Sequence, residues 1–182
     1  MTFLRGSRLG ILAMSLALVL GACERADSDD ESAATGDEVT PTGPVVINEV
    51  VAKAADGGAD WVELYNRGES DVSLDGYGLQ DDKDDNLFLL PQGLTISPGE
   101  FLVIEGKNST EELFFAFGLG SDEAVRLLDG DGVMIDMVDW EDGEAPIGQS
   151  YGRYPDGGTE VGTLEFTTYG AANGPFNASE AE

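Results

Sequence analysis

Histidine is absent from the 182 residues of the sequence, and cysteine occurs once, as Cys23. Without histidine the chain cannot build a Ser-His-Asp or Cys-His catalytic arrangement or a histidine-ligated zinc site, and it lacks the commonest general base near neutral pH. Without a second cysteine no disulfide forms within the chain. Hydrolysis by two carboxylates remains chemically open, but 36 acidic residues offer no distinctive pair.

Positive charge is also scarce, with nine basic residues against 36 acidic ones and a formal net charge of −27. Arg5 and Arg8 lie at the N-terminus, so a chain without its first 22 residues keeps seven basic residues and carries −29. Such a charge repels phosphate groups, so we expect no nucleic-acid or anionic-lipid partner. Divalent cations and basic surfaces are favoured instead, although the acidity also suits solubility or a saline medium.

No hydrophobic run is long enough to span a membrane. The longest, residues 9–20, has about a dozen residues, where a spanning helix needs roughly 20. It follows Arg5 and Arg8, which predicts a signal peptide over residues 1–22. The run ends at Leu20-Gly21-Ala22-Cys23, which is similar to the lipobox of bacterial lipoproteins. An ordinary buried thiol is the alternative.

The lipobox resemblance implies that Cys23 is a lipidation site. In that family the cysteine thiol is diacylated with palmitate or related chains, the leader is cut before it, and the new N-terminus is usually acylated. The expected protein is therefore exported and anchored to a membrane through its N-terminal lipid. Glu24, where some lipoproteins retained in the inner membrane carry Asp, slightly favours the outer membrane or cell surface over the inner membrane facing the periplasm.

Composition divides the rest of the chain into three parts. Residues 23–43 hold Cys23 and seven acidic side chains but almost nothing that could join a core, which predicts a disordered, self-repelling tether. Residues 44–176 carry short apolar runs broken by Gly, Asp, Asn and Pro, which predicts one folded domain. Residues 177–182 are expected to form a disordered tail.

The domain is predicted to be all-β. Its apolar runs are short, rich in β-branched residues and separated by turn signals, a pattern typical of an antiparallel sandwich or a small barrel. One helix is expected over residues 110–117, because Ser109 and Glu112 have capping-box spacing. The expected strands are residues 45–52, 60–66, 76–80, 86–90, 100–105, 124–128 and 133–140.

Several motifs in this domain resemble, in order and spacing, those of the lamin-tail domain. One departure is Tyr169, where bacterial members commonly have Pro. The matching segments are Val46-Ile47-Asn48-Glu49-Val50, Asp60-Trp61-Val62-Glu63-Leu64-Tyr65-Asn66, and residues 72–79, 96–104, 125–129, 149–157 and 170–173.

The lamin-tail resemblance implies an immunoglobulin-like antiparallel β-sandwich, in agreement with the expected strands. Lamin-tail domains of nuclear lamins are associated with protein and chromatin contacts. Bacterial members often accompany secreted or membrane-associated hydrolases, which implies an adaptor or targeting module. The acidic composition argues against direct DNA binding by this chain.

The matching residues are expected to act mainly in structure. Trp61 and Tyr65 share one face of a strand, with residues 62 and 64 on the other, so one set should fill the core between sheets. Asn48 and Glu49 are polar in an otherwise apolar strand. If buried they need partners, for which backbone groups of a neighbouring loop are expected, and a ligand site is the alternative.

The densest acidic cluster is a candidate calcium site. Calcium takes six to eight oxygen ligands, and carboxylates from one loop could supply most of them. An EF-hand is excluded, because Leu87 stands where that loop needs Gly and Gly93 where it needs the bidentate Glu. An irregular calcium loop and a solvated turn remain as alternatives. The candidate ligands are Asp81, Asp82, Asp84, Asp85 and Asn86.

Three further motifs are interpreted as structural. Residues 129–132, Asp-Gly-Asp-Gly, lie between two expected strands and predict a hairpin turn, with a metal site as the alternative. Trp140 is expected in the core, although an exposed Trp140 beside its carboxylates could stack on a sugar or hold a cation. Pro98-Gly99 suits the central positions of a type II turn.

The function expected from the sequence is non-catalytic. A lipid-anchored envelope or surface protein would use its lamin-tail-like sandwich to bind an envelope protein or polysaccharide, as an adaptor or scaffold. A calcium-dependent adhesion or carbohydrate-binding module is the alternative, with calcium as its cofactor. A carboxylate-dependent hydrolase is the third hypothesis.

Overall fold

The computed structural model describes residues 39–83 and 85–178. In these ranges the chain forms eleven strands and one short 3-10 helix, η1 (Ala55–Gly57). The same ranges contain no helix with the length and apolar character needed to cross a membrane. The expected signal peptide, Cys23 and most of the expected tether lie outside the described residues.

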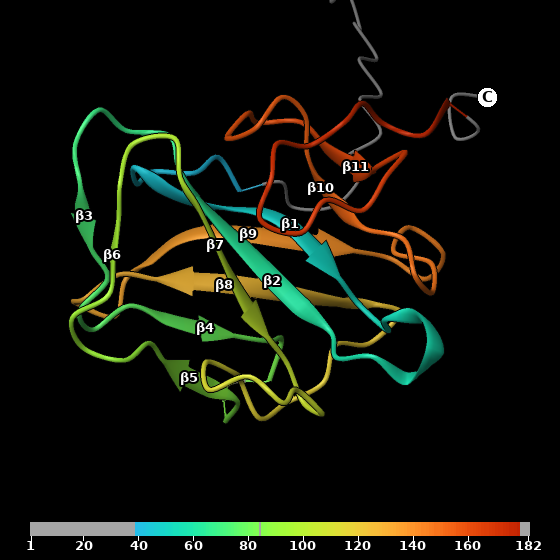
Figure 1. Cartoon of the computed structure of the whole chain (residues 1–182), viewed down its shortest axis with the longest axis horizontal. Coiled ribbons are helices and arrows are strands. Elements are labelled where there is room, and N and C mark those ends of the chain that lie inside the picture. The colour runs from blue at the N-terminus through green and yellow to red at the C-terminus, as the bar shows by residue number, and fades with distance from the viewer. Residues whose placement is uncertain (1–38, 84, 179–182) are drawn as a thin grey trace, which may run out of the picture. The chain divides into compact units, whose positions relative to one another are not determined.

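The larger sheet has five antiparallel strands in the order β11-β10-β1-β2-β7 (Figure 1). Its middle strand, β1, is buried at all seven residues, although two of them are polar. The strands are β1 (Val45–Val51), β2 (Trp61–Asn66), β7 (Phe101–Glu105), β10 (Tyr151–Arg153) and β11 (Val161–Thr163).

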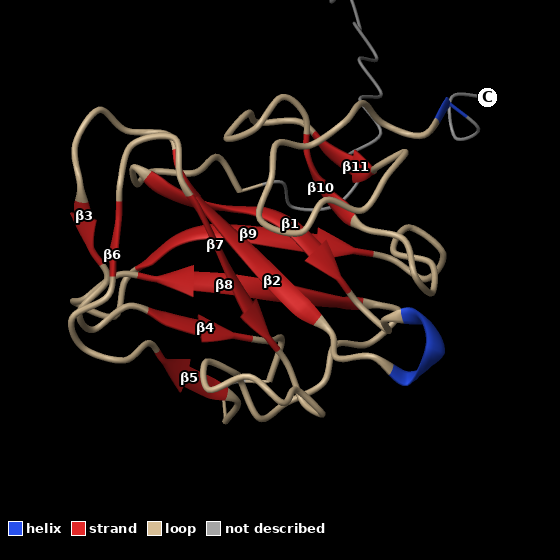
Figure 2. Cartoon of the chain, in the orientation of Figure 1, coloured by secondary structure: helices blue, strands red, loops and turns tan. Residues whose placement is uncertain are grey.

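A four-stranded antiparallel sheet has the order β5-β4-β8-β9, and β3 (Val72–Ser73) pairs with β6 (Thr95–Ile96) beside it. In Figures 1 and 2 the five-stranded sheet lies in front of the four-stranded one, and the two form the layers of a sandwich. The expected all-β antiparallel sandwich is confirmed. The strands of the second layer are β4 (Gly78–Gln80), β5 (Leu87–Leu89), β8 (Glu123–Leu128) and β9 (Met134–Trp140).

The core between the two sheets is apolar. Val62 and Leu64 of β2 are fully buried in one cluster with Leu79 of β4 and Leu127 of β8. Trp140 joins this cluster with 1% of its surface exposed, and its Nε1 donates to the carbonyl oxygen of Gly120 at 3.0 Å. The expectation of a core position for Trp140 is therefore confirmed.

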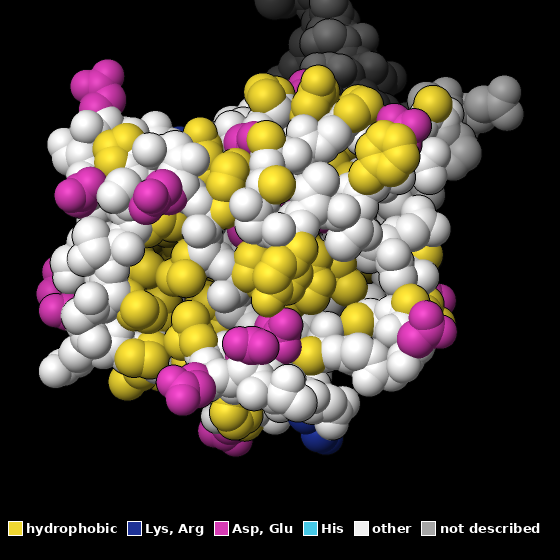
Figure 3. All heavy atoms as spheres, in the orientation of Figure 1, with side chains coloured by type: hydrophobic (Ala, Val, Ile, Leu, Met, Phe, Trp, Pro, Cys, Tyr) yellow, Lys and Arg dark blue, Asp and Glu magenta, His cyan; other side chains and the backbone are white. Residues whose placement is uncertain are grey.

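The other side of β2 forms the outer face of the five-stranded sheet. Trp61 packs edge-to-face on Tyr169, with ring centroids 5.5 Å apart, and Tyr65 packs on Phe101 at 4.8 Å. Figure 3 shows hydrophobic side chains gathered over β2 on this face, with acidic side chains beside them. Val62 and Leu64 are thus the set that fills the core, while the aromatic set packs outside.

All seven expected strands are present, with small shifts at their ends, but the helix expected over residues 110–117 is wrong. The segment is anchored as an irregular loop. The Ser109 hydroxyl donates to a Glu105 carboxylate oxygen at 2.6 Å and accepts the N–H of Glu111, an ST turn in place of a helix cap. The N–H of buried Phe115 donates to the carbonyl of Glu105 in β7. In a helix this N–H would instead donate to a carbonyl within the same segment.

Both expected turns are confirmed. The N–H of Glu100 donates to the carbonyl of Ser97 at 3.0 Å, and Gly99 has a φ of +75°, as a type II turn requires. The N–H of Gly132 donates to the carbonyl of Asp129 at 2.9 Å in the hairpin turn that joins β8 to β9.

The residues just before β1 are bonded to the sandwich. The N–H of Thr42 donates to the carbonyl of Ile135 in β9 at 2.9 Å. Arg67 donates to the carbonyls of Pro41 and Gly43 at 2.8 and 3.1 Å. Contacts with the folded domain therefore begin a few residues before position 44.

Candidate functional site

The acidic loop between β4 and β5 is organised around Asp81, whose side chain is buried. One carboxylate oxygen accepts the N–H of Lys83 at 2.8 Å, and the other accepts Nδ2 of Asn86 at 2.7 Å. Asp81 lies directly after β4, so these two bonds close the turn that leads into β5.

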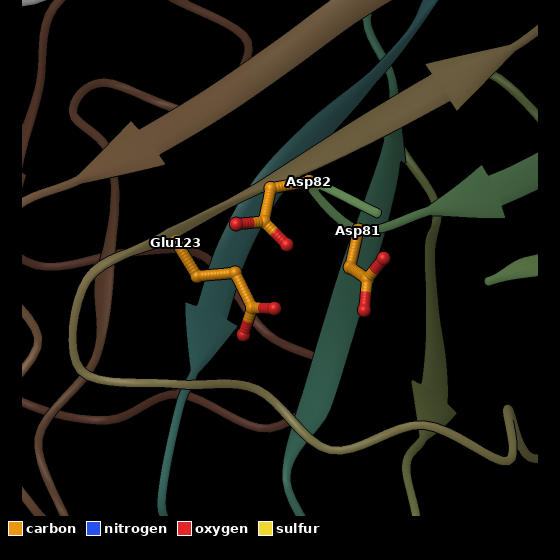
Figure 4. A group of neighbouring side chains, drawn as sticks. All are labelled: Asp81, Asp82 and Glu123. Atoms are coloured by element: carbon orange, nitrogen blue, oxygen red, sulfur yellow. The ribbon is translucent and has the colours of Figure 1, made fainter. Parts of the chain in front are cut away.

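Three carboxylates converge at this loop: Asp81, Asp82 and, from the start of β8, Glu123 (Figure 4). Each offers one oxygen, and these oxygens lie within 4.8 Å of one another. The Nζ of Lys83 lies 2.8 Å from Glu123, 3.0 Å from Asp82 and 3.9 Å from Asp81. Lys83 therefore supplies a counter-charge, which a divalent cation would have to displace.

Lys83 and its carboxylate neighbours shift one another's pKa values. Hydrogen bonds to Glu123 and then Asp82 raise the pKa of Lys83. The bond from Lys83 is in turn the main cause that lowers the pKa of Asp82. Lys83 and Asp82 are thus both charged near neutral pH, which suits an electrostatic binding role.

Of the predicted calcium ligands, the structure brings Asp81 and Asp82 together. Asp85 is exposed, Asn86 is engaged with Asp81, and Asp84 lies outside the described residues. Glu123 was missed by sequence reasoning. It stands 40 positions from Lys83, and only the pairing of β4 with β8 brings it close, for which the sequence carries no local signal.

An open groove of about 400 Å³ lies beside the acidic loop. Its size is within the range of small-molecule sites. The walls combine two lysines and carboxylates with aromatic and aliphatic carbon, so the groove suits a ligand with both polar and apolar parts. It is lined by Asp81, Lys83, Asp85, Asn86, Leu87, Phe88, Lys107, Ala116, Phe117 and Gly118.

A second polar group is buried on the outer side of the five-stranded sheet. The register of β1 against β2 shifts at Asn48, which makes Asn48 the extra residue of a β-bulge. Its Nδ2 donates to Glu63 at 3.1 Å and to Asp156 at 2.9 Å, and its Oδ1 accepts the N–H of Gly157 at 3.0 Å. The bulge thus aims Asn48 at the loop after β10.

Glu49 and Glu63 bind the segment after β11. Glu49 accepts the N–H and the hydroxyl of Thr168 at 2.9 and 2.7 Å, and Glu63 accepts the N–H of Gly170 at 2.8 Å. The expected pairing of Asn48 and Glu49 with backbone groups of neighbouring loops is confirmed. These side chains bind the chain's own C-terminal segment, which occupies the position where a ligand was the alternative expectation.

Burial raises the pKa of Glu63 to about 8, against the lowering effect of its bonds from Asn48 and Gly170. Burial also raises the pKa of Glu49. The geometry supports a proton on Glu49, because the single Thr168 hydroxyl lies 2.7 Å from both a Glu49 oxygen and Oδ1 of Asn173. A protonated Glu49 can donate to Thr168 while Thr168 donates to Asn173.

Arg153 of β10 forms a buried ion pair with Asp136 of β9, with Nη2 and Oδ1 2.8 Å apart. Arg153 also donates to the carbonyls of Ile47 and Gly158, each at 2.8 Å, and Asp136 accepts the N–H of Ile47 at 2.7 Å. Burial raises the pKa of Asp136, while the Arg153 charge opposes this. The pair therefore links β9 of the four-stranded sheet and β10 of the five-stranded sheet to β1.

The carboxyl groups of Glu49, Glu63 and Asp136, which have raised pKa values, do not line the groove. General acid catalysis needs a carboxyl group that keeps its proton near neutral pH and contacts substrate. These three are bonded to the protein itself, so their raised pKa values give no support to a hydrolase in the groove.

Comparison with known protein families gives a match. The sequence model of the family described as Lamin Tail Domain matches residues 38–142, more than half of the chain. No curated protein matches the sequence. The matched region runs from before β1 to just after β9, so β10, β11 and the segment that binds Glu49 and Glu63 lie beyond it.

Proposed function

The chain belongs to the lamin tail domain family, and from this premise we propose that it is a lipid-anchored protein of the cell envelope whose immunoglobulin-like sandwich binds another envelope component. The family match is the observation that carries the binding role, because the domain is an immunoglobulin-like module and not a known enzyme family. The role is that of an adaptor or scaffold, with a protein or a polysaccharide as the partner.

The anchor rests on the sequence. Arg5 and Arg8, the apolar run and Leu20-Gly21-Ala22-Cys23 occur in the order that a lipoprotein leader needs. Two or three acyl chains on Cys23 give stable membrane attachment, where one chain is marginal. The net charge of −27 favours a partner with basic groups over one with phosphates.

Metabolic labelling with a palmitate analogue tests the anchor. We expect the label on the full chain and its loss in the Cys23→Ala variant, with the protein moving from the membrane to the soluble fraction. Ser15→Ala, in the same leader, is the matched control and should keep the label. Labelling that survives Cys23→Ala would refute the anchor.

A calcium-dependent adhesion or carbohydrate-binding module is the second candidate. The observation that favours it is the convergence of Asp81, Asp82 and Glu123 (Figure 4). Calcium should then raise the melting temperature, Asp82→Asn should abolish this effect, and Lys83→Met should enlarge it by removing the competing ammonium group. Asp131→Asn, in an exposed turn, is the control. No shift at millimolar calcium would eliminate this candidate.

A further inference from the structure

The outer face of the four-stranded sheet carries large apolar side chains that remain exposed. The strand register places Leu89, Gly78, Leu128 and Met134 in one row across all four strands. The exposed fractions are 60% for Leu89, 46% for Leu87 and 41% for Met134. In Figure 1 this sheet lies behind the five-stranded one, so the face is turned away from the viewer. We call it the leucine–methionine face, formed by Leu87, Leu89, Leu128, Met134 and Met137, with Gln80 and Arg126 between Leu87 and Met137 in the next row.

The face is continuous across β4 because Gly78 has no side chain. A Cβ at Gly78 would lie 2.9 Å from Cδ1 of Leu87 and 3.3 Å from Cδ2 of Leu89, so both leucines lean over this strand. On the other side, Met134 and Met137 are both of the methionines in the described residues. Methionine is flexible and polarisable, and it is enriched on surfaces that adapt to a bound partner.

Acidic side chains flank the face at both ends. Asp129 and Asp131 lie in the turn that joins β8 to β9, next to Leu128 and Val133. At the opposite end, exposed Asp85 comes just before β5. The apolar row of Leu89, Leu128 and Met134, between acidic ends, matches a segment with apolar residues between basic ones, while Gln80 and Arg126 stand in the next row.

The same charges argue against other occupants. Two copies of the chain would bring acidic ends together in a protein of net charge −27, and an anionic lipid surface would be repelled as well. Residues 24–43 of this chain hold seven acidic side chains, so they are repelled by the ends of the face too.

We propose that the leucine–methionine face is the docking surface for a cationic amphipathic segment of a protein partner. The apolar side chains of that segment cover the leucines and methionines, and its Lys or Arg residues pair with Asp85, Asp129 and Asp131. This inference rests on the proposed binding role of the domain and names the surface and the chemistry of the partner.

Photocrosslinking in intact cells tests the surface with the full, membrane-attached chain. A photoreactive phenylalanine analogue replaces Leu89 on the face or, as the matched control, Phe166, which is equally exposed at 60% but lies after β11. The expected adduct forms from position 89 and not from 166, and its crosslinked segment carries Lys or Arg around apolar residues. High salt should reduce the yield, because the contacts with the acidic ends are solvent-exposed.

A second variant measures the contribution of the face. Met134→Ser should lower the yield from position 89 by about tenfold, the factor expected for loss of one apolar contact. Ile147→Ser, at a site 71% exposed outside the face, should leave it unchanged. Both sites are exposed, so an unchanged melting temperature is expected and excludes unfolding as the cause.

Several outcomes overturn the inference. The first is an adduct of position 89 with a second copy of the chain, with phospholipid, or with an acidic or uncharged segment. The others are equal adducts from positions 89 and 166, and the absence of any adduct from position 89. Adducts confined to position 166 would refute this face while leaving the binding role intact. Absence of the lipid label from the wild-type chain, or labelling that survives Cys23→Ala, would refute the anchor and leave this test unaffected.

Discussion

Changing Glu63 to Gln tests whether a buried carboxyl group of β2 holds a proton in the folded protein. Glu63 is fully buried and accepts bonds from Asn48 and Gly170, so it links the β-bulge to the C-terminal segment. Gln has the same size but does not titrate. Its amide nitrogen must face one of the two donors, which costs roughly 1–3 kcal/mol of stability relative to the protonated wild type.

The pH dependence gives the magnitude. Burial raises the pKa of Glu63 from 4.5 to about 8, so between these values the folded protein binds one more proton than the unfolded chain. The stabilisation from this proton is complete below pH 4.5 and is lost as the pH rises through about 8. The loss is about 1.4 kcal/mol for each pH unit in the interval, or roughly 5 kcal/mol in total.

Urea unfolding across this pH interval, followed by tryptophan fluorescence, measures the effect. We expect the free energy of unfolding of the wild type to fall by about 1.4 kcal/mol more per pH unit than that of Glu63→Gln. The variant is therefore less stable in mild acid, and it becomes the more stable of the two towards pH 8, because the wild type loses roughly 5 kcal/mol over the interval. Glu69→Gln, at an exposed site, should keep the wild-type slope. Equal slopes in the wild type and Glu63→Gln would refute a proton on Glu63.

Three further changes probe the interior, each measured by urea or thermal unfolding. Arg153→Met should cost about 3–5 kcal/mol because it leaves Asp136 buried without its counter-charge, and adding Asp136→Leu should recover part of this loss. Trp140→Ala should cost about 3–5 kcal/mol by opening a cavity in the core. Gly152→Ala should lower the melting temperature by more than about 4 °C, because the new Cβ presses on the main chain of β1. Gly118→Ala should not, because its Cβ makes only an ordinary contact with Asp60 at 3.6 Å.

The strands of the core could be predicted because a buried strand needs apolar and β-branched side chains, and this pattern is visible within a few neighbouring residues. Residues 45–52 and 60–66 carry β-branched and apolar side chains at the positions that face the core, and the turn residues between strands mark their ends. The hairpin at residues 129–132 and the turn at Gly99 were also predictable from local sequence. Each contains a glycine with a positive φ, which glycine adopts more readily than other residues.

The contacts that could not be predicted are long-range and polar. Residues 151–153, Tyr-Gly-Arg, have no apolar run, and β10 forms because Arg153 meets Asp136 and the carbonyl of Ile47. Glu123 reaches Asp82 and Lys83 only through the pairing of β8 with β4. The prediction of a helix over residues 110–117 was wrong because it rested on capping-box spacing alone. That spacing carries no information on the groups of Glu105 in β7 that bind this loop.

The placement of the partners of Glu49 and Glu63 has a consequence for the order of events in synthesis. Thr168 and Gly170, which bind these two glutamates, stand 119 and 107 positions later in the chain. Until these residues are added, Glu49 and Glu63 lack those partners on the outer side of the sheet, although Asn48 of β1 already bonds Glu63. The outer side of the sheet around these two glutamates is therefore completed only when the segment after β11 is in place.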